Sequence, residues 1–533
     1  MEYIWPQNDD ILTSTTMVIF ATATCWLFFA KGISTNETID KNADGKSSKI
    51  PDAPGGIPVL GHALSYKKDP PGFLLRMVRE CGPVFRLNLA GKKMIIVCGA
   101  EQQRQLASLP ESVLSLRKAV GAIGFEQMLG HKNVHEGTQI HKGIVKGIWN
   151  NKSKTGGASN NATSSLDRQL ITWQTGIRES METELMVSGD NGGGKNKVDF
   201  LKLVRRVTLR AVIDIFIGKA FLKDWTSCDF LKDFMDFQDT LEDVTAKSVL
   251  LPKWLALVAM LWPLQRRRER LQLVIQERLE SAMVQKKPNG GGSGSNNDDG
   301  AFGFWLHQVS AQGIPVSEIS EYIVGLLFAA HKNPAIGSAQ TFILLREHAS
   351  EEVRARCQKE AAELISSSTP IGWSRYSSSL PTLRRSCLES LRVTAHTIGG
   401  VRTAQKDLNV LVKEDIDGKE TLYHIPNDSS VGFAHITSSL DTSVWGKDAG
   451  VFDSDLSRHS EESYTDDYKF TTFSHGVHKC PGREFAMIHL QTTVALLLVE
   501  YNVELPEKIP SLDFERATLA QRESAVMVSI KRR

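Results

Sequence analysis

One stretch carries most of the information about this chain: Phe473-Ser-His-Gly-Val-His-Lys-Cys480-Pro-Gly-Arg-Glu-Phe-Ala486. A strongly apolar run over 487–501 follows it and predicts a buried helix. Cys480 therefore lies on a glycine-bearing loop just before a helix N-terminus, where free N–H groups and the helix dipole favour a thiolate. Gly476 and Gly482 lack a Cβ, so the loop backbone can approach a flat cofactor closely.

Two more side chains of this loop suit haem. We expect Phe473 to cover the sulfur and His478 to donate a hydrogen bond to a haem carboxylate. A single thiolate beside a flat apolar face is the arrangement in which cysteine ligates haem iron, so the pattern predicts haem b with Cys480 as the axial ligand. The alternative is a helix-capping loop with an incidental buried cysteine.

The fixed positions of this loop, Phe-x-x-Gly-x-His-x-Cys-x-Gly, all match the haem-binding signature of the cytochrome P450 superfamily, which the chain therefore resembles. The resemblance extends loosely over 51–533. It implies one large, mainly α catalytic domain with small β-sheets, the cytochrome P450 fold.

A second motif supports this resemblance. Glu389-Ser-Leu-Arg392 begins 91 residues before Cys480 and places an acid and a base on one helix face. In the resembled family Glu-x-x-Arg is a buried ion-pair lock behind the haem, which implies that structural role for Glu389 and Arg392. The resemblance also implies that Arg402 binds a haem propionate; the alternative is a surface arginine.

The segment 445–456 resembles the meander of the same family but departs from it at two positions. Ser454 and Leu456 stand where a proline and an arginine are usual. Either the ion-pair lock lacks its usual third partner or Arg458 substitutes for it. Near the cysteine, Lys479, Arg483 and His475 form either a solvated face or a docking patch for an acidic electron-transfer partner.

The segment Glu321–Gly337 resembles the family's long central helix across the haem. Small Ala330 would leave room for oxygen and substrate, whereas Lys332 and Asn333 replace the usual acid and threonine that relay protons during oxygen activation. Ala330, Lys332 and Asn333 are therefore catalytic candidates. Asn333 is included because an asparagine amide still donates hydrogen bonds. In the alternative, Lys332 turns away from the haem. Pro334, which lacks an N–H, predicts a local opening of the helix.

Three functions remain open on this reading. The first is a mono-oxygenase that hydroxylates or demethylates a sterol, terpenoid or fatty acid, with electrons from NADPH through a separate reductase and optionally cytochrome b5. The second is an NADPH-independent lipid hydroperoxide isomerase or dehydratase, and the third a non-catalytic haem protein. Asn333 is similar to the sterol 7α-hydroxylase and prostacyclin synthase branches, and Leu-Leu-Phe-Ala over 326–329 to sterol 14α-demethylases.

The N-terminal region predicts attachment to a membrane. After a short acidic segment (1–10), residues 11–30 carry no charge, and 20 helical residues span about 30 Å, the thickness of a bilayer core. Lysines in the following linker (31–50) predict a single-pass anchor with a cytosolic body, as in the endoplasmic reticulum membrane. A cleaved targeting segment and a buried core helix are the alternatives.

Composition narrows the class of protein further. Among 533 residues, 63 basic and 61 acidic side chains give a net charge of +2. This balance does not indicate a nucleic-acid-binding protein. Seven cysteines without a CxxC fit a reducing compartment. Three low-complexity stretches, 150–165, 187–197 and 288–300, predict exposed insertions in a mainly helical body.

Overall fold

The computed structural model describes most of the chain beyond residue 47. The described residues are 48–137, 165–187, 197–218, 221, 229–248, 251, 253–285, 313–366, 380–413, 420–458, 461–516 and 518–533. All of them belong to the second of two compact units, Met1–Ser47 and Ser48–Arg533. The predicted anchor and nearly all of the linker and low-complexity stretches lie outside the described residues. Within the described part, no helix is both long and apolar enough to span a membrane.

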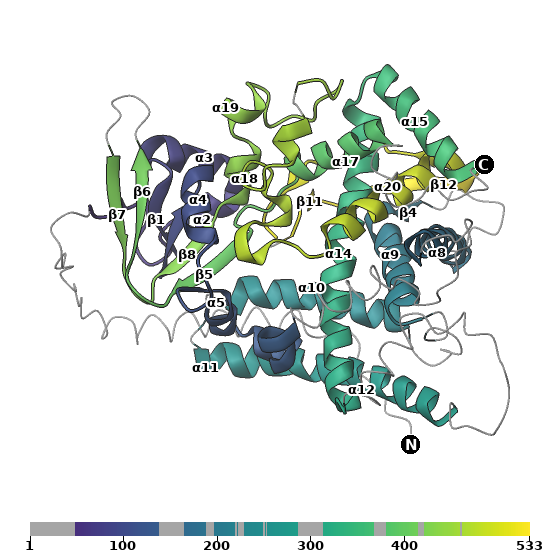
Figure 1. Ribbon diagram of the computed structural model, residues 1–533, viewed down its shortest axis with the longest axis horizontal. Helices are drawn as coiled ribbons and strands as arrows, with labels where there is room; N and C mark the ends of the chain where they lie inside the picture. The colour runs from purple at the N-terminus through teal and green to yellow at the C-terminus, as the bar shows by residue number, and fades with distance from the viewer. Residues whose placement is uncertain are drawn as a thin grey trace, which may run out of the picture. The chain divides into compact units, whose positions relative to one another are not determined.

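Helices make up most of the unit Ser48–Arg533, which confirms the mainly α fold expected from the sequence (Figure 1). The α-helices are α2 (Ala63–Lys68), α3 (Pro70–Cys81), α4 (Ala100–Ala107), α5 (Leu116–Ala122), α6 (Phe125–Leu129), α8 (Ser165–Val187), α9 (Phe200–Phe216), α10 (Phe230–Ser248), α11 (Lys253–Ala256), α12 (Trp262–Gln285), α14 (Val316–His348), α15 (Glu351–Ser366), α17 (Pro381–Val393), α18 (His435–Ser439), α19 (Thr442–Trp445) and α20 (Arg483–Glu500). Shorter π and 3₁₀ turns are η1 (Asn133–Gly137), η3 (Leu257–Leu261), η4 (Glu461–Tyr464), η5 (Thr471–Phe473) and η6 (Gly476–His478).

The β-structure is small, as the sequence predicts. A five-stranded sheet has the order β1-β2-β8-β5-β3, in which only β2 and β8 run parallel. Its strands are β1 (Val84–Leu89), β2 (Lys92–Val97), β3 (Leu114–Ser115), β5 (Gly400–Ala404) and β8 (Ser430–Phe433). The smaller sheets are β6-β7 (Leu408–Lys413, Glu420–Ile425), β4-β12-β9 (Val198–Asp199, Met527–Arg532, Tyr501–Glu504) and β10-β11 (Leu512–Asp513, Gln521–Arg522).

The hairpin β1–β2 shows how local sequence sets local structure. Val84 pairs with Val97 and Leu89 with Lys92, so a two-residue turn joins the strands. Both turn residues, Ala90 and Gly91, have positive φ (50° and 85°). Such a turn has the twist that matches two antiparallel strands, which is why a glycine stands there.

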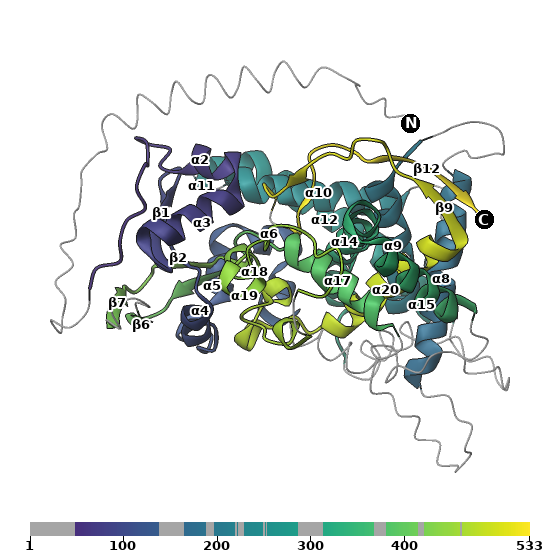
Figure 2. The ribbon, with the colours of Figure 1, turned by 90° about the horizontal axis from the view of Figure 1, so that it is seen from above.

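Helix α14 runs through the middle of the helical part (Figures 1 and 2) and packs against α9, α12, α17 and α20. It spans the segment in which the sequence places the family's central helix. Pro334 lies inside it without interrupting it, so the predicted opening does not occur. Because proline has no N–H, the carbonyl of Ala330 nevertheless lacks its helical donor.

Candidate active site

The loop that carries Cys480 is closed by its own backbone. The N–H of Cys480 donates to the carbonyl of Phe473 at 2.8 Å, and Gly482 is the N-cap of α20. Gly476 has a φ of +62°, and a Cβ there would clash with the carbonyl oxygen of Ala107 in α4. Glycine is therefore required at this position because α4 packs against it. The sequence did not indicate this reason.

Burial and the helix start act on the Cys480 thiol in opposite directions. Burial raises its pKa, whereas the backbone N–H of Gly482 and the charge of Arg483 lower it, and the net shift is upward. The helix start therefore lowers the thiol pKa, as expected, but burial outweighs this effect in the protein alone. A cation at the sulfur is needed to favour the thiolate, since a metal ligand must be deprotonated.

The aromatic and basic residues around the loop are held by neighbours. Phe473 is buried, with the guanidinium carbon of Arg483 5.4 Å from its ring centroid. His478 Nε2 lies 3.4 Å from Glu111 Oε2, so its bond to a haem carboxylate stays a prediction. In the basic patch, Lys479 and Arg483 both pair with Asp467, at 2.6 Å and 2.9 Å.

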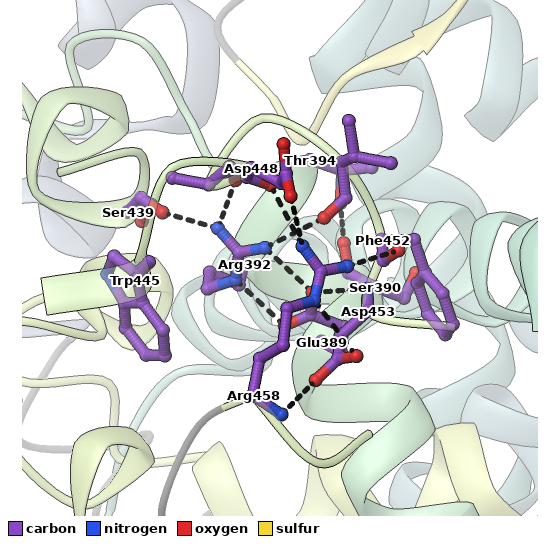
Figure 3. Close-up of polar contacts among 12 residues, drawn as sticks. Glu389, Ser390, Arg392, Thr394, Ser439, Trp445, Asp448, Phe452, Asp453 and Arg458 are labelled. Atoms are coloured by element: carbon purple, nitrogen blue, oxygen red, sulfur yellow. Dashed lines mark hydrogen bonds and ion pairs between the residues drawn. The ribbon is translucent and has the colours of Figure 1, made fainter. Parts of the chain in front are cut away.

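Glu389 and Arg392, on α17, form a buried ion pair (Figure 3). Arg392 donates from Nε and Nη2 to the two carboxylate oxygens of Glu389, at 2.8 Å and 2.7 Å. Its remaining N–H groups reach the carbonyls of Ser439 (2.8 Å), Val451 (3.2 Å) and Ala449. The guanidinium also lies 5.0 Å from the Trp445 ring centroid. Every charge in this group has a partner, which is the condition for a buried pair to be stable.

The third partner of the lock is not an arginine. Tyr464 Oη donates to Glu389 Oε2 at 2.7 Å, and the Asp453 N–H donates to Oε1 at 2.9 Å. Arg458 instead pairs with the Asp453 carboxylate at 3.1 Å and donates to the Phe452 carbonyl at 3.0 Å. The suggestion that Arg458 replaces the usual third partner is therefore wrong: Arg458 braces the segment that donates to Glu389.

Arg402, on β5, presents a different environment. Its side chain is buried and donates to the Val401 carbonyl at 2.7 Å, with its guanidinium carbon 5.7 Å from the Phe433 ring centroid. No carboxylate of the described residues lies within ion-pair distance of it. Burial lowers the pKa of Arg402 to about 10, opposed by the charge of Glu111. The surface alternative for Arg402 is excluded.

A buried histidine within electrostatic range of Arg402 also lacks hydrogen-bond partners. Both ring nitrogens of His435, which begins α18, have no hydrogen-bond partner among the described residues. Its ring lies 5.1 Å from that of His475, whose Nε2 contacts Gln103 Oε1 at 2.7 Å. Since a buried unsatisfied polar group costs about 1–3 kcal/mol, Arg402 and His435 together indicate a place for an anionic or polar group from outside the chain.

One stripe of α14 is accessible although most of the helix is buried. Ala329 is exposed and Ala330 and Asn333 are half-buried, whereas His331 and Lys332 are buried. Ala329 and Ala330 lie four and three positions before Asn333, so each of them neighbours Asn333 on the helix surface. Asn333 Oδ1 accepts the N–H of Leu519 at 3.3 Å, which orients the amide.

Lys332 points to the other side of α14, into ion pairs with α10. Its Nζ lies 2.7 Å from Asp239 Oδ1 and 2.6 Å from Glu242 Oε2. Arg205 of α9 pairs with the other oxygen of Asp239 at 2.9 Å. Lys332 therefore points away from the stripe that Ala330 and Asn333 share, as the alternative to a catalytic role predicts.

Comparison with known protein families identifies the family to which this chain belongs. The family model of Cytochrome P450 matches residues 51–530. The chain belongs to the cytochrome P450 family. As a cytochrome P450 it is a mono-oxygenase, an oxidoreductase that incorporates oxygen from O₂.

The relatives of this P450 are distant. It is 22% identical over 521 residues to the cytochrome P450 monooxygenase pynD of Aspergillus niger, covering 93% of this chain and 95% of the relative. It is 21% identical over 467 residues to a sterol 14alpha-demethylase of Mycolicibacterium vanbaalenii (86% and 92% covered) and 22% over 483 residues to lanosterol 14-alpha demethylase of Bos taurus (90% and 86%).

The residues of this P450 fit the haem-thiolate group that its family implies. Cys480 is a half-buried thiol that is not in a disulfide, and Arg402 and His435 are buried polar groups without an anionic partner in the described structure. A propionate would satisfy the Arg402 cation, whose burial is otherwise unfavourable. Cys480 would hold the iron, and Arg402 and His435 a haem carboxylate.

Tyr464 and His435 are the site residues that sequence reasoning missed. Tyr464 lies 75 positions from Glu389 and His435 33 from Arg402. Neither belongs to a motif with a regular spacing. A buried tyrosine or histidine gives no periodic signal, so only the tertiary structure brings these pairs together.

Proposed function

We propose that this cytochrome P450 hydroxylates or demethylates a lipophilic substrate, a sterol, terpenoid or fatty acid, with electrons from NADPH through a separate flavoprotein reductase. The observation that carries this proposal is the accessible stripe of Ala329, Ala330 and Asn333 on an otherwise buried α14. Two methyl side chains and one amide leave room for an apolar molecule and supply one oriented donor.

The chain's own residues divide the work of such a reaction. Haem, when bound through Cys480, supplies the oxygen activation. Ala329 and Ala330 leave space beside the reacting carbon. Because Asn333 Oδ1 is engaged by Leu519, its Nδ2 N–H groups are the donors that remain for holding a water or an oxygen atom in place.

The substrate class rests on two supports. The accessible stripe lies on a helix whose buried side chains are mostly aliphatic and aromatic. Two of the protein's distant relatives, a sterol 14alpha-demethylase and a lanosterol 14-alpha demethylase, are by name enzymes that act on sterols. Electron delivery and attachment to the endoplasmic reticulum membrane are further parts of the proposal; the uncharged segment 11–30 supports the second.

A second candidate activity, beside the mono-oxygenation typical of the family, is the NADPH-independent isomerisation or dehydration of lipid hydroperoxides. The observation that favours it is the lack of a carboxylate or hydroxyl at positions 332 and 333, with Lys332 committed to Asp239 and Glu242. Without those groups the accessible stripe offers a single amide for proton delivery. Rearrangement of a hydroperoxide needs no external electrons, so it is compatible with that site.

The two candidates separate in one assay. The full haem-loaded chain is incubated with a sterol and fatty-acid panel, with and without NADPH and a reductase, and with lipid hydroperoxides alone. Oxygenated product that requires NADPH supports the proposal, whereas turnover of hydroperoxides without NADPH and no NADPH-dependent product would contradict it.

A matched pair of variants assigns the roles on α14. Asn333→Ala is expected to lower product formed per NADPH by about tenfold, the effect of losing one hydrogen bond of about 1.4 kcal/mol in the reacting state. Lys332→Met, one position away, is expected to leave that ratio unchanged while lowering stability. An equal loss of product per NADPH in both variants would show that Lys332 takes part in the reaction.

A further inference from the structure

Three metal-ligating side chains outside the active site come together near the start of α14. Glu126 lies in α6, His135 in η1, and His131 one turn before His135. Their ligand atoms all lie within 4.8 Å of one another. None of the roles described above uses them.

The geometry brings both imidazoles to one carboxylate. His135 Nε2 lies 2.7 Å from Glu126 Oε1, and His131 Nδ1 lies 3.7 Å from Glu126 Oε2. The two histidine rings are 4.2 Å apart between centroids, as expected for residues four apart on one face of a helical turn. Two imidazole nitrogens and one carboxylate oxygen are a donor set that Zn²⁺ and similar divalent cations accept.

The backbone that carries the two histidines is held in place by α14. Glu321 accepts the N–H groups of Lys132 and Asn133, at 2.7 Å and 3.3 Å. Asn133 Nδ2 donates to the carbonyls of Leu129 (2.7 Å) and Glu321 (2.6 Å). Gly130, with φ +99°, allows the close approach to Glu321. These contacts preorganise the ligands, which is the role of outer residues in metal sites.

The surrounding charge favours a dication. The nearest lysine, Lys132, is paired with Glu136 at 3.2 Å and Glu318 at 3.4 Å, and Glu321 adds another carboxylate beside the turn. Arg268 donates to the backbone carbonyl of Glu126 at 3.3 Å, and its charge is paired with Glu269 at 3.4 Å.

We propose that Glu126, His131 and His135 bind one Zn²⁺ ion, with water at the fourth position. The His131 side chain is 67% exposed, which gives the ion a route from solvent. A bound ion would tie α6 to η1 and so stiffen the segment next to the first turns of α14. This site is independent of Cys480 and of the proposed reaction.

The test measures zinc directly. The untagged, haem-loaded full chain is dialysed to equilibrium against a series of buffered free Zn²⁺ concentrations, and bound zinc is measured by elemental analysis. We expect one saturable equivalent in the wild type. His131→Ala and His135→Ala should each weaken this binding by about a hundredfold or more, since even outer residues of metal sites contribute about 10- to 100-fold.

The matched control is His348→Ala. His348 is also exposed and lies 3.5 Å from a carboxylate, that of Glu347, but it has no second histidine beside it, so its removal should leave zinc binding unchanged. His131 is largely exposed, so His131→Ala should keep the circular dichroism spectrum and haem content of the wild type. No saturable zinc in the wild type, or the same binding in folded His131→Ala, would overturn the proposal.

Discussion

Arg392 and Arg402 lie ten positions apart and are both buried, yet their surroundings are opposite. Arg392 has a carboxylate, three carbonyls and an aromatic ring around it. Arg402 has one carbonyl and one ring, and no carboxylate within ion-pair distance among the described residues. A buried cation with a full set of partners needs nothing from outside the chain, whereas one without an anion indicates where the protein receives one.

The largest loss of stability is expected at the buried pair of Glu389 and Arg392, whose hydrogen-bond network is complete. Glu389→Gln leaves Arg392 as an uncompensated buried charge, so the free energy of unfolding should fall by about 3–5 kcal/mol. Urea denaturation followed by circular dichroism measures it.

The matched control is an exposed pair. Lys118 lies 2.5 Å from Asp428 with both side chains largely in solvent, so Lys118→Ala should cost at most about 1 kcal/mol. If Glu389→Gln cost no more than this control, the lock would have no special place in the fold.

Tyr464→Phe should have the next largest effect. It removes the hydroxyl that donates to Glu389 Oε2, and a hydrogen bond to a buried charge contributes about 1.5–3 kcal/mol. The loss should be additive with Lys118→Ala but not with Glu389→Gln, because only the latter shares its partner. Full additivity of Tyr464→Phe and Glu389→Gln in a double-mutant cycle would contradict the contact.

Arg402→Gln is expected to affect haem binding rather than the stability of the haem-free fold, the opposite of Glu389→Gln. In the haem-free protein, removal of a buried cation without an anion should leave stability unchanged or raise it. In the haem-loaded protein, loss of a charged hydrogen bond of about 1.5–3 kcal/mol should speed haem transfer to an acceptor protein about tenfold or more. Unchanged haem retention would remove Arg402 from the propionate site.

The smallest effect is a change in pH dependence. Although burial raises the pKa of Glu389, the hydrogen bond and charge of Arg392 more than offset this, and the net pKa lies below the usual value of a glutamate. The lock's contribution is therefore present above about pH 4.5 and is lost as pH falls through the lower folded value. The stability difference between the wild type and Glu389→Gln should narrow over that range in denaturation curves at successive pH values. A constant difference would mean that Glu389 is not ionised in the fold.

Local patterns predicted a large part of this molecule. The loop before Cys480 and the Glu389–Arg392 pair each depend on residues close in sequence, and each forms as expected. What the sequence did not show depends on distant partners. Lys332 turns away from the accessible stripe because carboxylates of α10, 93 positions earlier in the case of Asp239, neutralise it.

The cysteine itself shows the same limit of local reasoning. A helix start lowers a thiol pKa, but the packing that surrounds Cys480 raises it by more. Packing of this kind involves Leu391 of α17 and Phe473, which belong to the core cluster that Cys480 contacts. Only the tertiary structure shows which of the two effects is larger.

The central claim is that Cys480 is the haem ligand, and one spectrum tests it most directly. The full chain and Cys480→Ser are loaded with haem, reduced and exposed to carbon monoxide, and the difference spectra are recorded. We expect a strongly red-shifted Soret band in the wild type that the substitution abolishes, because thiolate ligation is what shifts it. A band at the position of histidine-ligated haem in the wild type, or a red-shifted band that persists in Cys480→Ser, would contradict the claim.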